Sequence, residues 1–324
     1  MDKPLYLLIC TQYDTSIIKR IRKTFPEILI NVITDEVELL KALPECDVLY
    51  LQKEISLHTS EKMAPIIANS EKLKWLHWGY TGFDRLRPFE SQWNKILITN
   101  SKGLMADAIA DYVILVIHLL YRNFPKIFRN QIKKVWERWP FDNPRGKTIG
   151  IIGLGSIGRE VAKRAKFFQM KVLGLVKHRV PIENIDFIYS QTQLQKFLSE
   201  SDVVVICVPL TSETEGLIGE RAIGWMKPGS YLINVARGKI IDEKALISAL
   251  RGGHIAGAAL DAFTQEPLSP QSELWSLENV IITPHLAGLF KGYPEKALDL
   301  FCENMRRFLG GKDLINVLDP NKGY

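Results

Sequence analysis

Apolar and polar residues alternate in blocks along the first hundred positions of the chain. Short apolar runs, typical of buried parallel strands, occur at 6–9, 28–33, 48–51, 75–77 and 96–99. Stretches with helical spacing of apolar positions separate them, at 15–25, 36–43 and 62–68. Because strands that alternate with helices pair in parallel, this pattern predicts a small doubly wound α/β domain.

A second alternating block begins at Lys147. Its predicted strands are 148–152, 171–176, 203–208, 231–235, 256–259 and 280–283, with helices among them at 157–168, 192–199 and 243–250. Six such strands complete a dinucleotide-binding sheet. One more amphipathic helix, 293–309, follows and could return to the first domain. We therefore predict a discontinuous first domain, 1–100 with 290–324, and a second domain over 101–289.

The segment between the two blocks has a different composition. Apolar spacing predicts a long helix over 106–122. The residues that follow, 124–144, are rich in aromatic and basic side chains, including Trp136 and Trp139, and have weak periodicity. We interpret them as an arm that packs outside its own domain, with a second subunit as one candidate.

Length, composition and charge narrow the class of protein. At 324 residues, two domains are expected. No apolar run approaches the roughly 20 residues that span a bilayer, and the first ten residues lack the features of a signal peptide. The net charge of +6 is interspersed with acids, so we expect neither a nucleic-acid nor a membrane partner. Scattered cysteines without metal-ligand spacing predict reduced thiols in a cytoplasmic protein, with no metal site: Cys10, Cys46, Cys207 and Cys302.

A glycine-rich hexad links the predicted strand 148–152 to the helix after it, Gly153-Leu154-Gly155-Ser156-Ile157-Gly158. In a dinucleotide-binding fold, Gly153 permits the tight turn, Gly155 lets the backbone approach a pyrophosphate, and Gly158 lets helix and strand pack closely. The amides of Ser156 and Ile157 would face the anion. The strand–loop–helix context favours a cofactor site over an ordinary glycine turn.

The end of the next predicted strand suggests which dinucleotide binds. An acid that bonds the ribose 2′-hydroxyl is expected there, but the sequence has Val176, followed by Lys177, His178 and Arg179. Cationic side chains suit a 2′-phosphate better than a hydroxyl. We therefore expect NADP to be preferred over NAD, with a solvated basic turn as the alternative.

Three ionisable residues in the last third of the chain indicate the chemistry. Arg237 in INVARG, Glu266 in LDAFTQEP and His285 in TPHLAG each lie just past a predicted strand, where open α/β sheets bind ligands. A permanent cation can hold a carboxylate, a group that titrates near neutrality can deliver a proton, and an acid can tune that group. This set meets the needs of 2-oxo acid reduction.

Longer motifs resemble the D-isomer-specific 2-hydroxyacid dehydrogenases, which include glyoxylate/hydroxypyruvate reductases, D-lactate dehydrogenases and phosphoglycerate dehydrogenases. The resemblance spans nearly the whole chain, through LKWLHWGYTGFD, ITNSKG, GLGSIG, CVPLTSETEGLIG, MKPGSYLINVARGKIIDEKAL, ALDAFTQEPL, ITPHLAG and NVLDPNKGY. It implies an α/β fold of two doubly wound parallel-sheet domains, a flavodoxin-like catalytic domain and an inserted Rossmann dinucleotide-binding domain. The implied activity is NAD(P)-dependent reduction of a small 2-oxo acid, such as glyoxylate or hydroxypyruvate, to the D-2-hydroxy acid, by a homodimer.

The resemblance also implies roles for the ionisable trio. Arg237 corresponds to the family's substrate-binding arginine, Glu266 to the acid that supports the histidine, and His285 to the catalytic acid/base. A guanidinium can grip a carboxylate through two hydrogen bonds. A carboxylate beside His285 would raise the pKa of the imidazole toward the working pH.

Cofactor contacts are implied for three further residues. Asp261 corresponds to an acid that contacts the nicotinamide carboxamide, and Pro209 and Thr211 lie where the family lines the adenosine pocket. A helix N-cap is the alternative for Asp261.

The implied substrate loop departs from the family pattern. Thr81 and Gly82 lie in the loop whose backbone amides receive the substrate carboxylate, but Tyr80 replaces a small residue and Thr81 replaces an alanine. Phe290 stands where a small polar residue is common. We expect Tyr80 and Phe290 to reshape the substrate pocket.

Two other functions stay open at this point. A phosphoglycerate-type dehydrogenase would need extra cations near residue 80, for which Lys53 and Arg85 are the candidates. A dinucleotide-sensing, corepressor-like binding protein is the other alternative, although the intact trio argues against a loss of catalysis.

Overall fold

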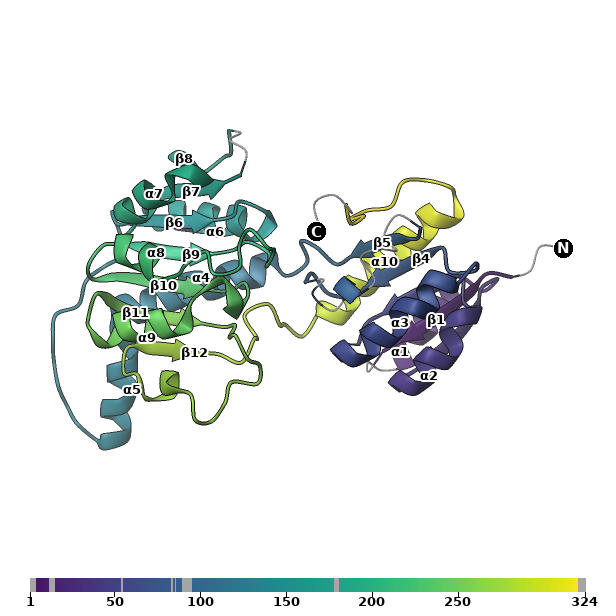
Figure 1. The fold of residues 1–324 in the computed structure, drawn as a ribbon, viewed down its shortest axis with the longest axis horizontal. Coiled ribbons are helices and arrows are strands. Elements are labelled where there is room, and N and C mark those ends of the chain that lie inside the picture. Colours follow the sequence, from purple (N-terminus) through teal and green to yellow (C-terminus); the bar gives the residue numbers. More distant parts are fainter. Residues whose placement is uncertain are drawn as a thin grey trace. The chain divides into compact units, whose positions relative to one another are not determined.

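The structure, a computed structural model, describes residues 4–11, 15–53, 55–82, 84, 86–88, 95–177 and 181–319, without the side chains of residues 15, 16 and 57. The chain forms two compact units (Figure 1). Unit 1 spans Met1–Leu104 and Phe290–Tyr324, and unit 2 spans Met105–Leu289.

Unit 1 is built on a five-stranded parallel sheet with the order β2-β1-β3-β4-β5. Its strands are β1 Tyr6–Cys10, β2 Leu29–Ile33, β3 Val48–Leu51, β4 Trp75–Trp78 and β5 Leu97–Asn100. Its α-helices are α1 Thr15–Thr24, α2 Glu36–Ala42, α3 Leu57–Asn69 and α10 Tyr293–Leu309. This strand order is that of flavodoxin-like sheets.

Apolar layers cover both faces of the unit 1 sheet. Alternate residues of β1 serve the two layers: Leu7 and Ile9 pack with α1 and α10, and Leu8 and Cys10 pack with α2 and α3. From α10, the Phe301 ring stacks at 4.2 Å on a tyrosine of β3. Because α10 supplies part of this core, unit 1 needs both ends of the chain.

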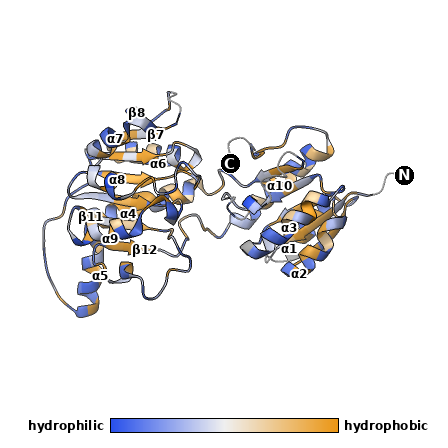
Figure 2. Ribbon diagram, viewed as in Figure 1, coloured by the Kyte–Doolittle hydropathy of each residue, from blue (hydrophilic) through white to orange (hydrophobic). Residues whose placement is uncertain are grey.

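Unit 2 is built on a seven-stranded parallel sheet with the order β12-β11-β10-β9-β6-β7-β8. Its strands are β6 Thr148–Ile152, β7 Lys171–Val176, β8 Phe187–Ser190, β9 Val203–Ile206, β10 Ser230–Asn234, β11 Ile255–Leu260 and β12 Val280–Ile282. Its α-helices are α4 Ala106–Tyr121, α5 Phe124–Lys133, α6 Ser156–Phe167, α7 Leu194–Glu200, α8 Glu220–Trp225 and α9 Glu243–Arg251. This is the Rossmann order with one further strand. Figure 2 shows the sheet strands as apolar segments and the helices with mixed faces.

The two sheets confirm the predicted fold class. The prediction of six strands in the second block was wrong by one, because β8 is a short edge strand whose Phe187 is exposed and whose sequence, FIYS, has no long apolar run.

Helices α4 and α6 pack on one face of the unit 2 sheet through an apolar layer. At its rim, Arg164 of α6 forms ion pairs with Asp107 and Asp111 of α4 and with Glu160 of its own helix. The opposite apolar layer includes side chains of α7, α8 and α9. None of the helices in the described ranges is long and apolar enough to cross a membrane.

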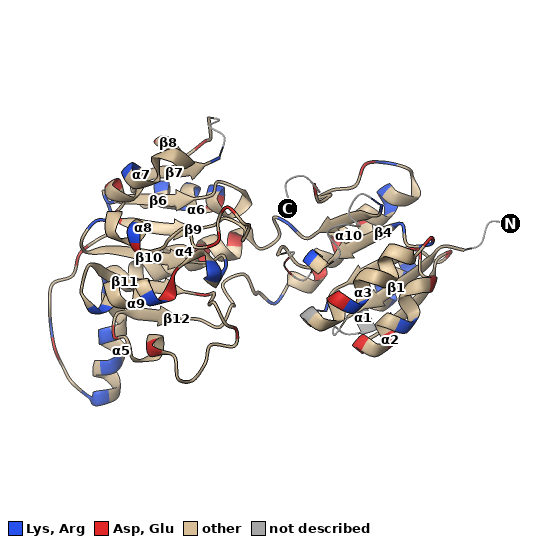
Figure 3. Cartoon of the chain, in the orientation of Figure 1, with Lys and Arg blue, Asp and Glu red and all other residues tan. Residues whose placement is uncertain are grey.

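The predicted arm contains a helix that the sequence did not predict. Residues Phe124–Lys133 form α5, and the chain then runs without regular structure to residue 144. Figure 3 shows Lys and Arg along α5. Large apolar side chains of the arm lie in solvent, above all Ile132 and Trp136, which are 81% and 92% exposed.

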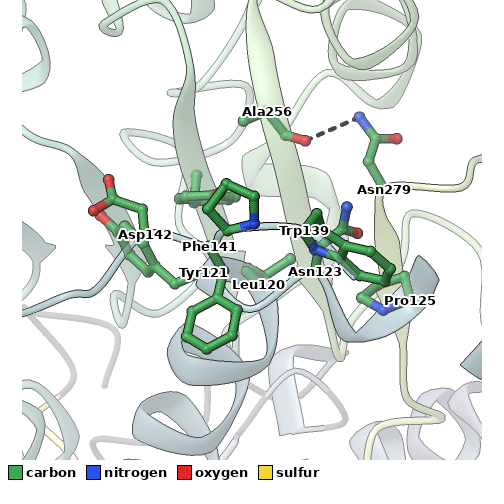
Figure 4. A pocket seen from close by; sticks show the side chains of 11 residues that line it. Leu120, Tyr121, Asn123, Pro125, Trp139, Phe141, Asp142, Ala256 and Asn279 are labelled. Atoms are coloured by element: carbon green, nitrogen blue, oxygen red, sulfur yellow. Dashed lines mark hydrogen bonds between the residues drawn. The ribbon is translucent and has the colours of Figure 1, made fainter. Parts of the chain in front are cut away.

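A cavity of about 360 Å³ lies under the arm (Figure 4). Trp139 and Phe141 of the arm line it together with Tyr231 and Ala256, near the starts of β10 and β11. Since ligands of open α/β sheets bind at the carboxyl ends of the strands, this cavity lies at the other edge of the sheet from the predicted site.

Candidate active site

The predicted ligand-binding residues of unit 2 follow the carboxyl ends of its strands. The glycine loop follows β6, Lys177 follows β7, and the loop 207–216 follows β9. Arg237, Asp261 and His285 come after β10, β11 and β12. Since all seven strands are parallel, these residues share one edge of the sheet, and the strand order reverses between β6 and β9.

The glycine loop is packed closely at two of its glycines and open at the third. Gly153 has a φ of +92°, and a Cβ there would lie 2.6 Å from the Val208 side chain. A Cβ at Gly158 would collide with the carbonyl oxygen of Gly153. At Gly155 the space is open, with no described atom within 4 Å of an added Cβ. Ser156 then begins α6, so the loop leaves a cradle at a helix N-terminus.

Lys177 forms an ion pair that the sequence did not predict. Its Nζ lies 2.8 and 3.0 Å from the two carboxylate oxygens of Glu213, and the side chains are 60% and 54% exposed. His178 and Arg179, which were also predicted to bind the cofactor, lie outside the described residues.

Pro209 and Thr211 lie in a turn that one hydroxyl holds together. Thr214 Oγ1 donates to the Pro209 carbonyl oxygen at 2.7 Å and accepts from the Thr211 amide at 2.8 Å. The turn leads away from β9, where the Cys207 amide donates to the carbonyl oxygen of Ile152 at 2.9 Å. The turn is therefore fixed directly beside the glycine loop.

Arg237 lies in a loop whose backbone is held by the side chain of Asn234. Asn234 is fully buried, donates from Nδ2 to the Arg237 carbonyl oxygen and accepts from the Ala236 amide, both at 3.0 Å. Arg237 Nη1 donates to the Ala236 carbonyl oxygen at 2.7 Å. Gly238 touches the backbone of Phe263 so closely that a Cβ would collide with it. The loops after β10 and β11 therefore cross in contact.

Glu266 and His285 are hydrogen-bonded. Glu266 accepts from the Phe263 amide at 2.9 Å through Oε1, and its Oε2 lies 2.8 Å from His285 Nδ1. The two side chains are 36% and 45% exposed, so the pair is accessible to solvent.

The pair changes the charge state of both groups. Burial raises the pKa of Glu266, but hydrogen bonds from His285 and Phe263 outweigh burial, and the net pKa is lowered. The hydrogen bond to Glu266 raises the pKa of His285, against burial and the positive charge of Arg237. The hydrogen bond therefore favours a protonated His285 imidazole next to an ionised Glu266 carboxylate.

Asp261 is 3% exposed and binds the loop that carries His285. Its Oδ1 accepts from the Thr283 hydroxyl at 2.6 Å and from the Leu286 amide at 2.9 Å. Its Oδ2 accepts from the Ala287 amide at 3.0 Å. No helix begins at Asp261 in the described chain, so the N-cap alternative was wrong.

The predicted substrate loop lies in unit 1, after β4. The Thr81 hydroxyl donates to the Ser101 carbonyl oxygen at 3.3 Å, and Asn100 Nδ2 donates to the Thr81 carbonyl oxygen at 3.1 Å. Trp78 Nε1 donates to the Gly82 carbonyl oxygen. The loop is therefore held to the end of β5 within its own unit.

Comparisons with known proteins agree with this geometry. Residues 114–287 match the sequence model of the D-isomer specific 2-hydroxyacid dehydrogenase, NAD binding domain. A glyoxylate reductase of Thermofilum pendens is 36% identical over 282 residues, which are 85% of this chain and 82% of that protein.

Two solved structures share the fold over almost the full length. A D-isomer specific 2-hydroxyacid dehydrogenase family protein from Aeromonas salmonicida has a TM-score of 0.83 and 30% identity, and covers 98% of this chain and 100% of its own. A D-isomer specific 2-hydroxyacid dehydrogenase from Xanthobacter autotrophicus, in complex with NADPH and MES, has a TM-score of 0.83 and 27% identity, with 99% and 100% covered.

The seven-stranded Rossmann sheet and these similarities identify an NAD(P)-dependent dehydrogenase. The chain belongs to the D-isomer specific 2-hydroxyacid dehydrogenase family. Its reaction is the NAD(P)-dependent reduction of a 2-oxo acid.

Replacing Glu266 by Gln should lower the pKa of His285, because the amide keeps a polar side chain but loses the charge that favours imidazolium. NMR titration of labelled histidine rings, with the His285 signal assigned through a His285→Gln variant, measures this pKa. The matched control, Glu215→Gln, changes an exposed acid elsewhere in unit 2 and should leave it unaltered. An unchanged His285 pKa in the Glu266→Gln variant would contradict the contact.

Proposed function

We propose that this protein reduces a small 2-oxo acid, such as glyoxylate or hydroxypyruvate, to the D-2-hydroxy acid. The Glu266–His285 hydrogen bond is the observation on which the proposal depends, because it supplies a protonated imidazole at the sheet edge that bears the dinucleotide loop. The relatives named glyoxylate reductase support this substrate class.

His285 is the proton donor in the proposed reaction. Glu266 engages Nδ1, so Nε2 is the nitrogen that delivers the proton to the carbonyl oxygen. Within the described chain, Nε2 has no hydrogen-bond partner. When bound, the reduced nicotinamide supplies the hydride.

Arg237 holds the substrate carboxylate in this proposal. Its guanidinium can form two parallel hydrogen bonds with a carboxylate and can draw electron density from the adjacent carbonyl. The Asn234 contacts fix the backbone from which Arg237 extends. Its charge also acts on His285, where it lowers the pKa of the imidazole and so favours release of the proton.

The substrate loop is proposed to select small substrates. In unit 1, the Tyr293 ring lies between two aromatic residues that depart from the family pattern, 6.2 Å from the Tyr80 ring and 5.8 Å from the Phe290 ring. Tyr80 directly precedes Thr81 and Gly82, which are proposed to receive the carboxylate, so this aromatic cluster begins next to the proposed carboxylate site. A phosphoglycerate-type activity has less support, since Lys53 already donates to the Thr34 carbonyl oxygen at 2.7 Å and Arg85 lies outside the described residues.

NADP is the proposed preferred cofactor. β7 ends in Val176, where an acid would favour NAD, and Lys177 follows it. The neighbouring Glu213 already pairs with Lys177, so a 2′-phosphate would have to compete with that carboxylate. The Xanthobacter autotrophicus structure in complex with NADPH supports the proposal.

A panel of 2-oxo acids, assayed with NADPH and NADH, tests the function. We expect reduction of glyoxylate and hydroxypyruvate, a higher kcat/KM with NADPH, and a rate that falls as pH rises through the raised pKa of His285. His285→Gln should lower kcat/KM by about 10²- to 10⁴-fold, the usual worth of a general acid, and leave NADPH binding intact by fluorescence titration.

The matched control for that panel is His58→Gln, which replaces an exposed histidine of unit 1. It should match the wild-type rates. Turnover that survives in the His285→Gln variant, or NADPH binding without reduction of any 2-oxo acid by the wild type, would overturn the proposal.

We also propose that the protein is a homodimer joined through the arm. Ile132 and Trp136 expose large apolar surfaces that a monomer would leave in water. A second copy can cover both arms symmetrically, as in an isologous interface.

Light scattering should give a molar mass twice the 36.9 kDa of one chain. Trp136→Glu should shift it toward one chain, because the interface would then bury a charge. Phe167→Glu, at an aromatic residue of α6 that is 83% exposed, serves as control and should stay dimeric. A wild-type mass of one chain would refute the dimer.

A further inference from the structure

Tyr112 of α4 reaches the loop of the proposed proton donor from a helix 171 positions away in the sequence. We propose that Tyr112 and Thr283 are positioning residues: through Asp261, they hold the backbone at 285–287 so that His285 meets Glu266. This inference rests on the proposed function of His285 but concerns residues outside the trio.

The contacts form one continuous chain of hydrogen bonds. The Tyr112 hydroxyl lies 2.8 Å from Thr283 Oγ1, and Thr283 Oγ1 lies 2.6 Å from Asp261 Oδ1. Asp261 then accepts from the amides of Leu286 and Ala287 at 2.9 and 3.0 Å. Three elements meet here: α4, the end of β11 and the end of β12.

Counting hydrogens fixes the direction of the chain. The Thr283 hydroxyl has a single hydrogen, and it donates that hydrogen to Asp261 Oδ1. Thr283 Oγ1 can then only accept from Tyr112, and the Tyr112 hydroxyl must donate. Burial raises the pKa of Tyr112 to about 12, so this donor keeps its proton at working pH.

The backbone at His285 needs such support. His285 has a φ of +53°, in the left-handed region that non-glycine residues rarely adopt. The His285 amide donates to the Thr283 carbonyl oxygen at 3.0 Å, which closes a tight turn just before the two amides that Asp261 binds. A residue in this conformation persists when its surroundings over-determine it, and here the hydrogen bonds to Asp261 do so.

The same hydrogen bonds allow the Asp261 carboxylate to be buried. It is 3% exposed and accepts three hydrogen bonds from its own chain, which stabilise a buried carboxylate. Loss of the Thr283 hydroxyl would leave Oδ1 with one donor fewer. The loop would then loosen, and the Glu266–His285 contact would weaken with it.

The decisive measurement is the pKa of His285 in the cofactor-free protein, followed by NMR in Thr283→Val, Thr283→Ser and Tyr112→Phe variants. Around His285, the charged groups Glu266, Arg237 and Asp261 stay unchanged in all three. We expect Thr283→Val to lower the pKa of His285 from its raised value, Tyr112→Phe to lower it less, and Thr283→Ser, which keeps the hydroxyl, to restore it.

Turnover gives the second readout. Thr283→Val should lower kcat on the order of 10- to 100-fold, as small misplacements of a catalytic group do, with little change in the Kd of NADPH. Tyr121→Phe, at the last residue of the same helix, is the matched control and should resemble the wild type in both measurements.

An unaltered His285 pKa in both Thr283→Val and Tyr112→Phe would overturn the positioning role, whatever the rates are. If the pKa of His285 is lowered in the variants but the wild-type protein reduces no 2-oxo acid, the positioning role is upheld and the proposed function is refuted. If Tyr121→Phe lowers the thermal stability and the pKa of His285 as much as the Thr283 and Tyr112 variants do, the effect is one of general packing. That result would also overturn the positioning role.

Discussion

The hydrogen bond between the Glu266 carboxylate and His285 Nδ1 is the contact on which the site depends. At 2.8 Å it raises the pKa of the imidazole, fixes the ring and leaves Nε2 for the proposed proton transfer. Its two residues come from the loops after β11 and β12, which parallel pairing brings to one edge of the sheet. The fold therefore brings Glu266 and His285 together, and their hydrogen bond favours the positive charge on the imidazole.

Buried polar residues at strand ends hold the loops that bear the ionisable groups. Asn234 does this for Arg237, and Asp261 does it for His285. In both cases a buried side chain forms hydrogen bonds with backbone groups of the loop and so fixes the loop's conformation. At the end of β7, the ion pair between Glu213 and Lys177 would compete with a 2′-phosphate and so limit the proposed preference for NADP.

The sequence alone predicts much of this molecule because its signals are local. Apolar runs and helical spacing identify most elements, and the glycine hexad, Arg237, Glu266 and His285 stand in short motifs at strand ends.

The supporting residues are harder to predict. Tyr112 lies in the middle of a helix, and its partner Thr283 is 171 positions away. Asn234 and Thr283 do lie at strand ends, which is a signal that could have singled them out. Helix α5 was missed although Phe124, Ile127, Phe128 and Ile132 recur at helical spacing, because the arm as a whole, 124–144, has weak periodicity.

The stereochemistry of the product tests the central claim most directly, because the proposed roles of His285 and Arg237 require that one face of the carbonyl meets the hydride. Hydroxypyruvate is the suitable substrate, since its reduction creates a stereocentre, whereas glyoxylate gives a product with none. Chiral chromatography of glycerate, formed with NADPH as the reductant, should show the D-enantiomer alone. L-glycerate, or a mixture of the two enantiomers, would contradict the claim that the protein forms the D-2-hydroxy acid.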